Sequence, residues 1–135
     1  RLANSKIDVI YSSPYERAKQ TAQAISKLIN KPIEYRGHLI EFNSQVESFE
    51  ELNQRAKTIL QHLLDHHRDQ SVLCVSHASM IETIIAKMIF GDHLTLSIME
   101  DIKEHFGTTN TGISICDFTQ KHGWSLLSYN DTNHL

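Results

Sequence analysis

The sequence predicts an α/β domain built as a three-layer sandwich, with helices on both faces of a mixed, mostly parallel sheet. Two observations predict this class. Strand-like apolar runs alternate twice with helix-like amphipathic segments, and two further strand-like runs, separated by a turn, close the chain. A chain of 135 residues is long enough for one domain with its own core, so we expect residues 1–135 to form a single domain.

The first predicted unit is a strand followed by a helix. Residues 7–11 form a short β-branched run that is typical of a strand. Ser13 has the position and the chemistry of a helix N-cap, because Pro14 follows it directly and Glu16 stands three residues later, at the capping-box spacing. We therefore expect a helix that is capped by Ser13 and ends near Asn30.

The second predicted unit repeats this order after a loop. Residues 33–35 favour a short strand, whereas residues 37–46 show no periodicity and are typical of a loop. Ser48 and Glu51 form another capping box, and apolar residues at helical spacing follow them. These apolar residues are Leu52, Ala56, Ile59, Leu60, Leu63 and Leu64.

The last third of the chain contains one more strand, one more helix and a strand pair. Residues 72–75 are a continuous apolar run, which predicts a parallel strand that is buried on both faces. Ser79 and Glu82 repeat the capping spacing, and the helix that we expect there is apolar over much of its circumference. Residues 113–118 and 125–129 predict an antiparallel pair, because a turn-like segment separates them.

Charge and composition exclude several classes of function. The formal net charge is −3 and the pI is near 6.3, so the broad positive field of a nucleic-acid-binding protein is missing. The longest apolar stretch, near residues 80–90, contains Glu82 and Lys87 and is too short to cross a bilayer, so we expect no membrane partner. Cys74 and Cys116 each lie in an apolar run, which predicts free thiols and a cytoplasmic location; the alternative is a buried disulfide.

Arg17 and His77 are the candidate binding residues, because each follows a predicted strand where a helix starts. The carboxyl ends of parallel strands meet at one edge of a sheet, where helix N-termini supply free N–H groups to an anion. In isolation, Arg17 is more typical of an exposed helix arginine, and His77 of a structural histidine at a strand end. Because they occur together at two strand exits, they predict a site for a small anion such as phosphate.

Several segments resemble the histidine phosphatase, or phosphoglycerate-mutase-like, superfamily. The most specific is residues 11–22 (YSSPYERAKQTA), which resembles the second signature of the family. Residues 75–78 (VSHA) resemble its second histidine motif. Further similar segments are 39–42 (its acid-bearing segment), 46–48 (its Gly-Glu-Ser entry to the next helix), and 110–114 and 130–135 (its closing strands). The resemblance therefore spans nearly the whole chain.

This resemblance implies a phosphoglycerate-mutase-like fold and phosphoryl transfer through a phosphohistidine. It implies that Arg17 grips the transferring phosphoryl oxygens and that a cationic His77 donates to the same oxygens. It also implies that Glu41, as an acid with a raised pKa, protonates the leaving oxygen. Without the resemblance, Glu41 is more typical of a solvated loop acid. The substrate-binding positions that the resemblance implies are Ser13, Arg17, Ala78 and Asn110.

Two features of the family are missing from the sequence. The family's nucleophile is the histidine of an Arg-His-Gly motif at the end of its first strand, and no Arg-His-Gly occurs here. In the family that strand lies between the strand ending near His77 and the strand starting near Ile113, so we expect residues upstream of Arg1, or another chain, to supply it. Only six residues separate Glu41 from Ser48, where the family usually has a cap insertion. We therefore expect no cap between about residues 42 and 47, which leaves either an unusually open site or an omitted loop.

The leading hypothesis is a cofactor-independent phosphatase that acts on small phosphomonoesters as a monomer or homodimer. The alternatives are phosphoglycerate mutase activity, which is an isomerase reaction, and a non-catalytic module that binds phosphoryl groups. His62 and His66 are four residues apart in a predicted helix, but no third ligand has a suitable spacing, so we expect no metal.

Overall fold

The structure is a computed structural model that describes residues 2–135. Its strands and α-helices alternate through most of the chain, and short 3-10 helices lie at Leu2–Asn4, Gly37–Leu39 and Gly91–His93. In chain order, the strands and α-helices of the described residues are β1 (Val9–Ser12), α1 (Glu16–Ile29), β2 (Ile33–Tyr35), α2 (Phe49–His66), β3 (Val72–Val75), α3 (Ala78–Phe90), α4 (Leu96–His105), β4 (Ile113–Thr119) and β5 (Gly123–Asp131).

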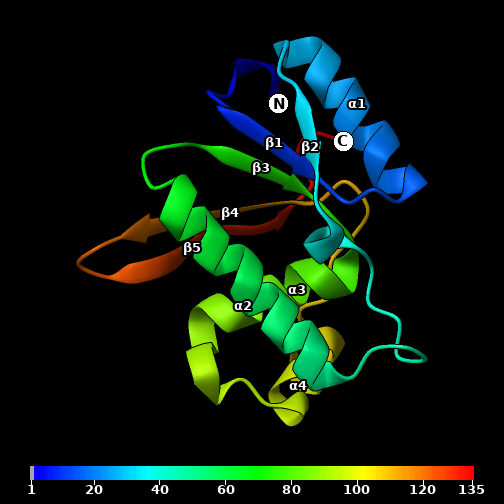
Figure 1. The fold of residues 1–135 in the computed structure, drawn as a ribbon, viewed down its shortest axis with the longest axis vertical. Helices are drawn as coiled ribbons and strands as arrows, with labels where there is room; N and C mark the ends of the chain where they lie inside the picture. The colour runs from blue at the N-terminus through cyan, green and yellow to red at the C-terminus, as the bar shows by residue number, and fades with distance from the viewer. Residues whose placement is uncertain (1) are drawn as a thin grey trace.

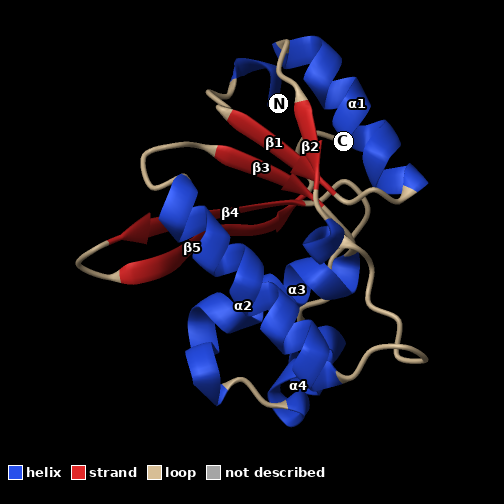
Figure 2. Ribbon diagram, viewed as in Figure 1, coloured by secondary structure: helices blue, strands red, loops and turns tan. Residues whose placement is uncertain are grey.

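The strands form two separate sheets. β1 is the middle strand of a parallel sheet with the order β2-β1-β3, in which Tyr11 pairs with both Glu34 and Cys74. β4 and β5 form an antiparallel pair, which Figure 2 shows on the β3 side of the first sheet. The predicted α/β class, with its parallel strands and closing strand pair, is therefore confirmed.

Helices cover both faces of the parallel sheet (Figure 1). Right-handed crossovers that leave β1 toward β2, and β2 toward β3, place α1 and α2 on opposite faces. On the α2 face, the ring of Tyr11 lies in a core with residues of α2 and α3. The buried members of this core are Tyr11, Leu39, Leu52, Ala56, Ile59 and Met80. Ile10, the neighbour of Tyr11, is fully buried, as are Ala18 and Ala22 of α1.

The start of α1 differs from the prediction. The helix begins at Glu16 with Tyr15 as its N-cap residue, so the prediction that Ser13 caps it is wrong. The reason lies in the backbone, because the N–H of Ser13 donates to the carbonyl of Val75 (2.9 Å) and keeps Ser13 in line with the strands. The end of the helix is as expected, with Asn30 in a left-handed conformation at the C-cap.

The α2 start agrees with the prediction in detail. Ser48 is the N-cap; its hydroxyl accepts a hydrogen bond from the N–H of Glu51 (3.2 Å), and the Glu51 carboxylate accepts one from the N–H of Ser48 (2.8 Å). The predicted capping box is therefore confirmed.

After β3, the structure differs from the sequence prediction in two ways. α3 begins at Ala78 rather than after a Ser79 cap, because Glu82 turns inward and accepts hydrogen bonds from the N–H and hydroxyl of Thr108 (2.9 and 3.0 Å). Helix α4 was not predicted, although Thr95 caps it by accepting from the N–H of Ile98 (3.3 Å).

β3 is less buried than its sequence predicts. All four of its residues are only half-buried, whereas the continuous apolar run predicts a strand that is buried on both faces. The reason is that β3 is an edge strand among the described residues, with β1 on one side only. Its Cys74 and the Cys116 of β4 are free thiols, and burial raises the pKa of both. Within residues 2–135, no helix combines the length and the apolar character that a bilayer crossing needs.

Candidate active site

Two strand ends and two helix starts meet at one edge of the parallel sheet. Arg17 is the second residue of α1, just beyond β1, and His77 is the N-cap residue of α3, just beyond β3. β1 and β3 run parallel and pair in register up to Ser12 and Val75, so both helices start at the same edge. This is the edge at which open α/β sheets bind ligands.

Arg17, Glu41 and His77 are in direct contact at this edge. The Nε–H of Arg17 donates to Nδ1 of His77 (3.0 Å), and its Nη2 lies 3.1 Å from Oε2 of Glu41 in an ion pair. The same Glu41 oxygen lies 3.9 Å from His77 Nδ1. The structure therefore brings together the three residues for which the resemblance implies catalytic roles.

His77 lies at the bottom of this group. Its side chain is 1% exposed, and its Nε2 lies 2.9 Å from the hydroxyl of Ser13, which also accepts from the N–H of Tyr15 (3.2 Å). The Tyr15 ring meets the imidazole edge-on, with 5.5 Å between ring centroids. Because Nδ1 accepts from Arg17, the hydrogen-bond pattern assigns the proton of the neutral ring to Nε2, which donates to Ser13.

Burial lowers the pKa of His77, and the positive charges of Arg17 and Arg55 lower it further, while Glu41 acts in the opposite direction. The lowered pKa favours the neutral ring in the free protein, and the cationic His77 that donates to phosphoryl oxygens stays a prediction. An arriving anion would favour the protonated ring, because an opposite charge stabilises the cation.

Arg17 and Glu41 form the solvent-facing part of the site. The Arg17 side chain is 68% exposed and the Glu41 side chain is 29% exposed, in contrast to the buried His77 beneath them. An exposed guanidinium can exchange one anionic partner for another at small cost, since exposed ion pairs contribute little stability. In this arrangement the Glu41 carboxylate is the anionic partner of Arg17.

Sequence reasoning missed Arg55, which holds the segment that carries Glu41. Its Nε and Nη2 donate to the two carboxylate oxygens of Glu47, each at 2.7 Å. Its Nη1 donates to the carbonyls of Ile40 (2.7 Å) and His38 (3.0 Å). A signal existed, because Arg55 falls three residues after Leu52, on the apolar stripe of the predicted helix.

The other predicted substrate-binding positions lie differently. Ser13 is buried and bonded to His77, so it supports the site from below. Ala78 is exposed at the first position of α3, next to His77. Asn110 is exposed in the turn before β4, and within the described residues no hydrogen bond or ion pair joins it to Arg17, Glu41 or His77.

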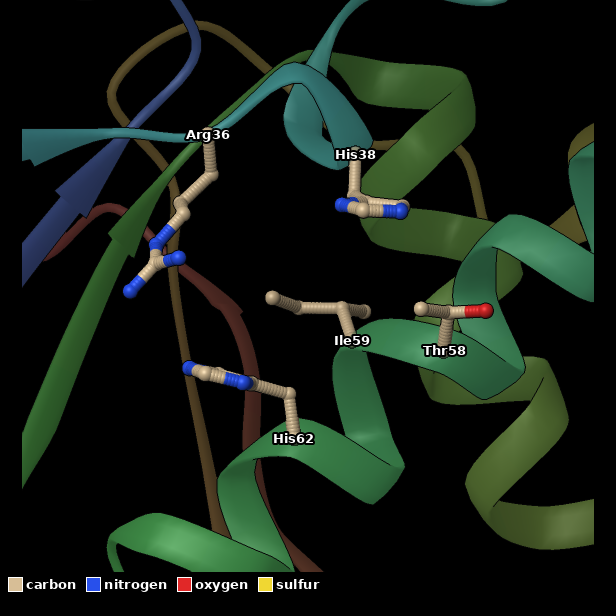
Figure 3. A pocket seen from close by; sticks show the side chains of 5 residues that line it. All are labelled: Arg36, His38, Thr58, Ile59 and His62. Atoms are coloured by element: carbon tan, nitrogen blue, oxygen red, sulfur yellow. The ribbon is translucent and has the colours of Figure 1, made fainter.

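A small cavity of about 70 Å³ lies between the end of β2 and helix α2 (Figure 3). Its lining residues are Arg36, His38, Thr58, Ile59 and His62. Beside it, the Tyr11 hydroxyl lies within hydrogen-bond distance of His62 Nε2 (3.1 Å) and His67 Nε2 (2.5 Å) and accepts from Arg36 (3.2 Å). In the part of the chain that is described, no cluster of three or more acidic, histidine or cysteine side chains is arranged to hold a metal ion.

Comparison with known proteins identifies the family. The model of the histidine phosphatase superfamily (branch 1) matches residues 1–46 and 42–132, which together cover nearly the whole chain. None of the curated protein sequences matches the chain significantly.

Solved structures with the same fold include several phosphatases. A mutant phosphoserine phosphatase from Entamoeba histolytica, in complex with phosphoserine, has a TM-score of 0.78 at 23% identity, covering 95% of this chain and 76% of that one. A putative α-ribazole-5′-phosphate phosphatase from Escherichia coli has a TM-score of 0.79 at 20% identity, covering 95% and 75%. A mycobacterial glucosyl-3-phosphoglycerate phosphatase, in complex with inorganic phosphate, has a TM-score of 0.77 at 15% identity, covering 96% and 80%.

These similarities agree with the α/β fold described above. The match of the family model over nearly the whole chain decides the assignment. The chain belongs to the histidine phosphatase superfamily, branch 1, and its fold is that of the phosphatases in this superfamily.

Proposed function

We propose that the intact protein is a cofactor-independent phosphatase that hydrolyses small phosphomonoesters through a phosphohistidine. The observation that carries this proposal is the contact of Arg17 with both Glu41 and His77 at the edge where β1 and β3 end. The family membership and the phosphomonoesters named for the similar structures support the same reaction and the same size of substrate. The net charge of −3 favours a small substrate over a nucleic acid, and free thiols favour a cytoplasmic location.

The nucleophilic histidine belongs, in this proposal, to a strand upstream of Arg1. The division of the strands into two sheets supports it, because among the described residues β3 pairs only with β1 and β4 pairs only with β5. An additional strand between β3 and β4 would pair with both of these edges. If it runs parallel to β3, its carboxyl end lies at the same edge as His77, where an Arg-His-Gly motif would place its histidine.

The proposed reaction has two transfers. In the first, an imidazole nitrogen of the upstream histidine attacks phosphorus, the bond to the leaving oxygen breaks, and the Glu41 carboxyl protonates that oxygen. In the second transfer, water attacks the phosphorus of the phosphohistidine and gives a proton to the Glu41 carboxylate. The bond between phosphorus and the imidazole nitrogen breaks, so inorganic phosphate leaves and the histidine is restored. Arg17 and His77 stabilise the charge on the phosphoryl oxygens in both transfers.

Substrate choice, in this proposal, depends on the segment between Glu41 and Ser48. The family model matches the chain in two pieces that meet at residues 42–46, where the family usually has a cap insertion. Without a cap, the exposed Arg17 is accessible to phosphomonoesters of different shapes. Phosphoglycerate mutase activity is the alternative reaction of the same site, and it differs in returning the phosphoryl group to a sugar acid instead of to water.

The direct test is hydrolysis of p-nitrophenyl phosphate by the intact protein, with vanadate as an inhibitor. We expect turnover that vanadate suppresses, because vanadate resembles the transferring phosphoryl group. If the intact protein binds phosphate without turnover, and its upstream residues contain no Arg-His-Gly, the protein is a phosphoryl-binding module and the catalytic proposal is wrong. Transfer between the phosphate positions of a phosphoglycerate, faster than its hydrolysis, identifies a mutase.

A further inference from the structure

We propose that Arg55 is a positioning residue for Glu41, which it places by binding the backbone carbonyls of His38 and Ile40 before that residue and the side chain of Glu47 after it. This inference rests on the proposed function, because it concerns the residue that protonates the leaving oxygen.

The hydrogen bonds of Arg55 connect helix α2 at three points to the segment that carries Glu41, residues 36–47. It binds Glu47 with two bonds of 2.7 Å each, and it binds the carbonyls of Ile40 and His38 at 2.7 and 3.0 Å. The side chains of Arg55 and Glu47 are only 11% and 17% exposed. Paired, charge-assisted bonds with little access to water are among the strongest hydrogen bonds in proteins and fix orientation as well as distance.

Other contacts also fix this segment. Among its carbonyls, that of Leu39 accepts from the hydroxyl of Ser76 (2.7 Å), next to His77, and the Leu39 side chain is fully buried. His38, the residue before Leu39, lines the cavity of Figure 3. The carbonyls of Arg36 and Gly37 accept only local bonds from the N–H groups of Leu39 and Ile40 (3.1 and 3.3 Å). Arg55 therefore supplies two of the three side-chain bonds to the carbonyls of residues 36–40.

Glu41 depends on this backbone because its own contacts are few. Its Oε2 pairs with the exposed Arg17 (3.1 Å), and its Oε1 accepts from the N–H of Phe42 (3.1 Å). Since the phosphoryl group is expected to take over Arg17, the remaining contacts of the Glu41 carboxyl are the N–H of Phe42 and the more distant Nδ1 of His77 (3.9 Å), so its place depends mainly on the backbone. A displacement of about 1 Å at such a group can cost about a hundredfold in rate.

Leaving-group dependence separates positioning from a general loss of structure. The p-nitrophenolate ion is a good leaving group that needs no proton, whereas an alkyl alkoxide needs one from Glu41. A displaced Glu41 therefore slows the hydrolysis of an alkyl phosphate much more than that of p-nitrophenyl phosphate. A partly unfolded protein loses both activities equally.

The first experiment compares these two substrates in the variants Arg55→Lys, Glu47→Gln and Glu41→Gln of the intact protein. We expect each variant to lose at least about tenfold in kcat on propyl phosphate and less than about threefold on p-nitrophenyl phosphate. Arg68→Lys is the matched control, because Arg68 lies just beyond the other end of α2 and its Nε donates to the carbonyl of Leu64, away from Glu41. Equal losses on both substrates in Arg55→Lys, or no loss on either, would overturn the inference.

The second experiment needs no turnover. Glu41→Gln should lower the pKa of His77, because the Glu41 carboxylate raises it. NMR titration measures this drop in the His77 pKa, first in the unmodified protein and then in a protein that carries Arg55→Lys. If Arg55 places Glu41 beside the imidazole, the drop should be smaller by at least about half in the Arg55→Lys protein. An undiminished change overturns the inference, even if the protein hydrolyses no phosphomonoester and the proposed function itself has failed.

Discussion

The surroundings of Arg17, Glu41 and His77 determine how accessible and how charged each side chain is. Arg17 is exposed and free to exchange partners, whereas His77 is buried with both ring nitrogens bonded. Burial favours the neutral ring, and a bound anion would favour its protonated form. We therefore expect an anion to contact the exposed guanidinium before the buried imidazole.

Two histidines with lowered pKa values should make stability depend on pH. Burial, followed by the charge of Arg36, lowers the pKa of His62, and burial also lowers that of His77. Below the ordinary value of 6.5 the unfolded chain binds more protons than the folded one, so stability is lost as the pH falls through this window. We expect the melting temperature to fall from about pH 7 to pH 5, and His62→Gln to reduce that fall.

Thermal melts across this range check the effect of His62. The exposed His134 provides the control His134→Gln, which should keep the slope of the unmodified protein. An identical slope in His62→Gln would show that burial and the charge of Arg36 do not disfavour the charged form of this ring.

At the scale of elements, the α2 start determines how firmly the Glu41 loop is attached to the fold. The capping box of Ser48 and Glu51 closes the first turn of α2 directly after this loop. Seven residues into the helix, Arg55 returns to the loop through Glu47 and Ile40. Both ends of the loop therefore depend on the first two turns of one helix.

Ser48→Ala should lower the free energy of unfolding by about 1 kcal/mol, because it removes the acceptor of the Glu51 N–H. Urea unfolding of the intact protein measures this change. Ser44→Ala in the exposed turn before α2 is the matched control and should have little effect. A loss in the Ser48 variant no larger than in the control would contradict the role of the cap.

Local sequence signals predicted most elements but not all of their limits. The α2 cap was predictable because Ser48 and Glu51 satisfy each other within one turn. The start of α1 was not, because Ser13 is held by the carbonyl of Val75, which is distant in sequence. Arg17 and His77 could be recognised from their positions after strands, whereas the partners of Arg55 lie on a loop whose path no periodicity reveals.

At the scale of the whole molecule, the divided sheet is the dominant feature. β3 and β4 each have a partner on one side only among the described residues, and the half-buried residues of β3 show the effect on packing. The β4–β5 pair also exposes Ile115, Leu126 and Leu127. Unpaired strand edges with exposed apolar side chains are a source of instability and of association.

A polypeptide that starts at Arg1 should therefore fold poorly by itself. We expect a broad, weakly cooperative melt for residues 1–135, and a sharp one for the protein with its upstream residues. Circular dichroism of the two forms makes the comparison. A sharp cooperative transition of residues 1–135 alone would contradict the proposal that a further strand pairs with β3 and β4.

The central claim is that Arg17 and His77 act on one phosphoryl group. Its most direct test is the turnover of p-nitrophenyl phosphate by the intact protein and by its variants Arg17→Ala and His77→Ala. We predict that each substitution reduces kcat by at least about a hundredfold while the protein remains folded, because each removes a group that stabilises charge in the transition state. Unchanged rates in both folded variants would contradict it.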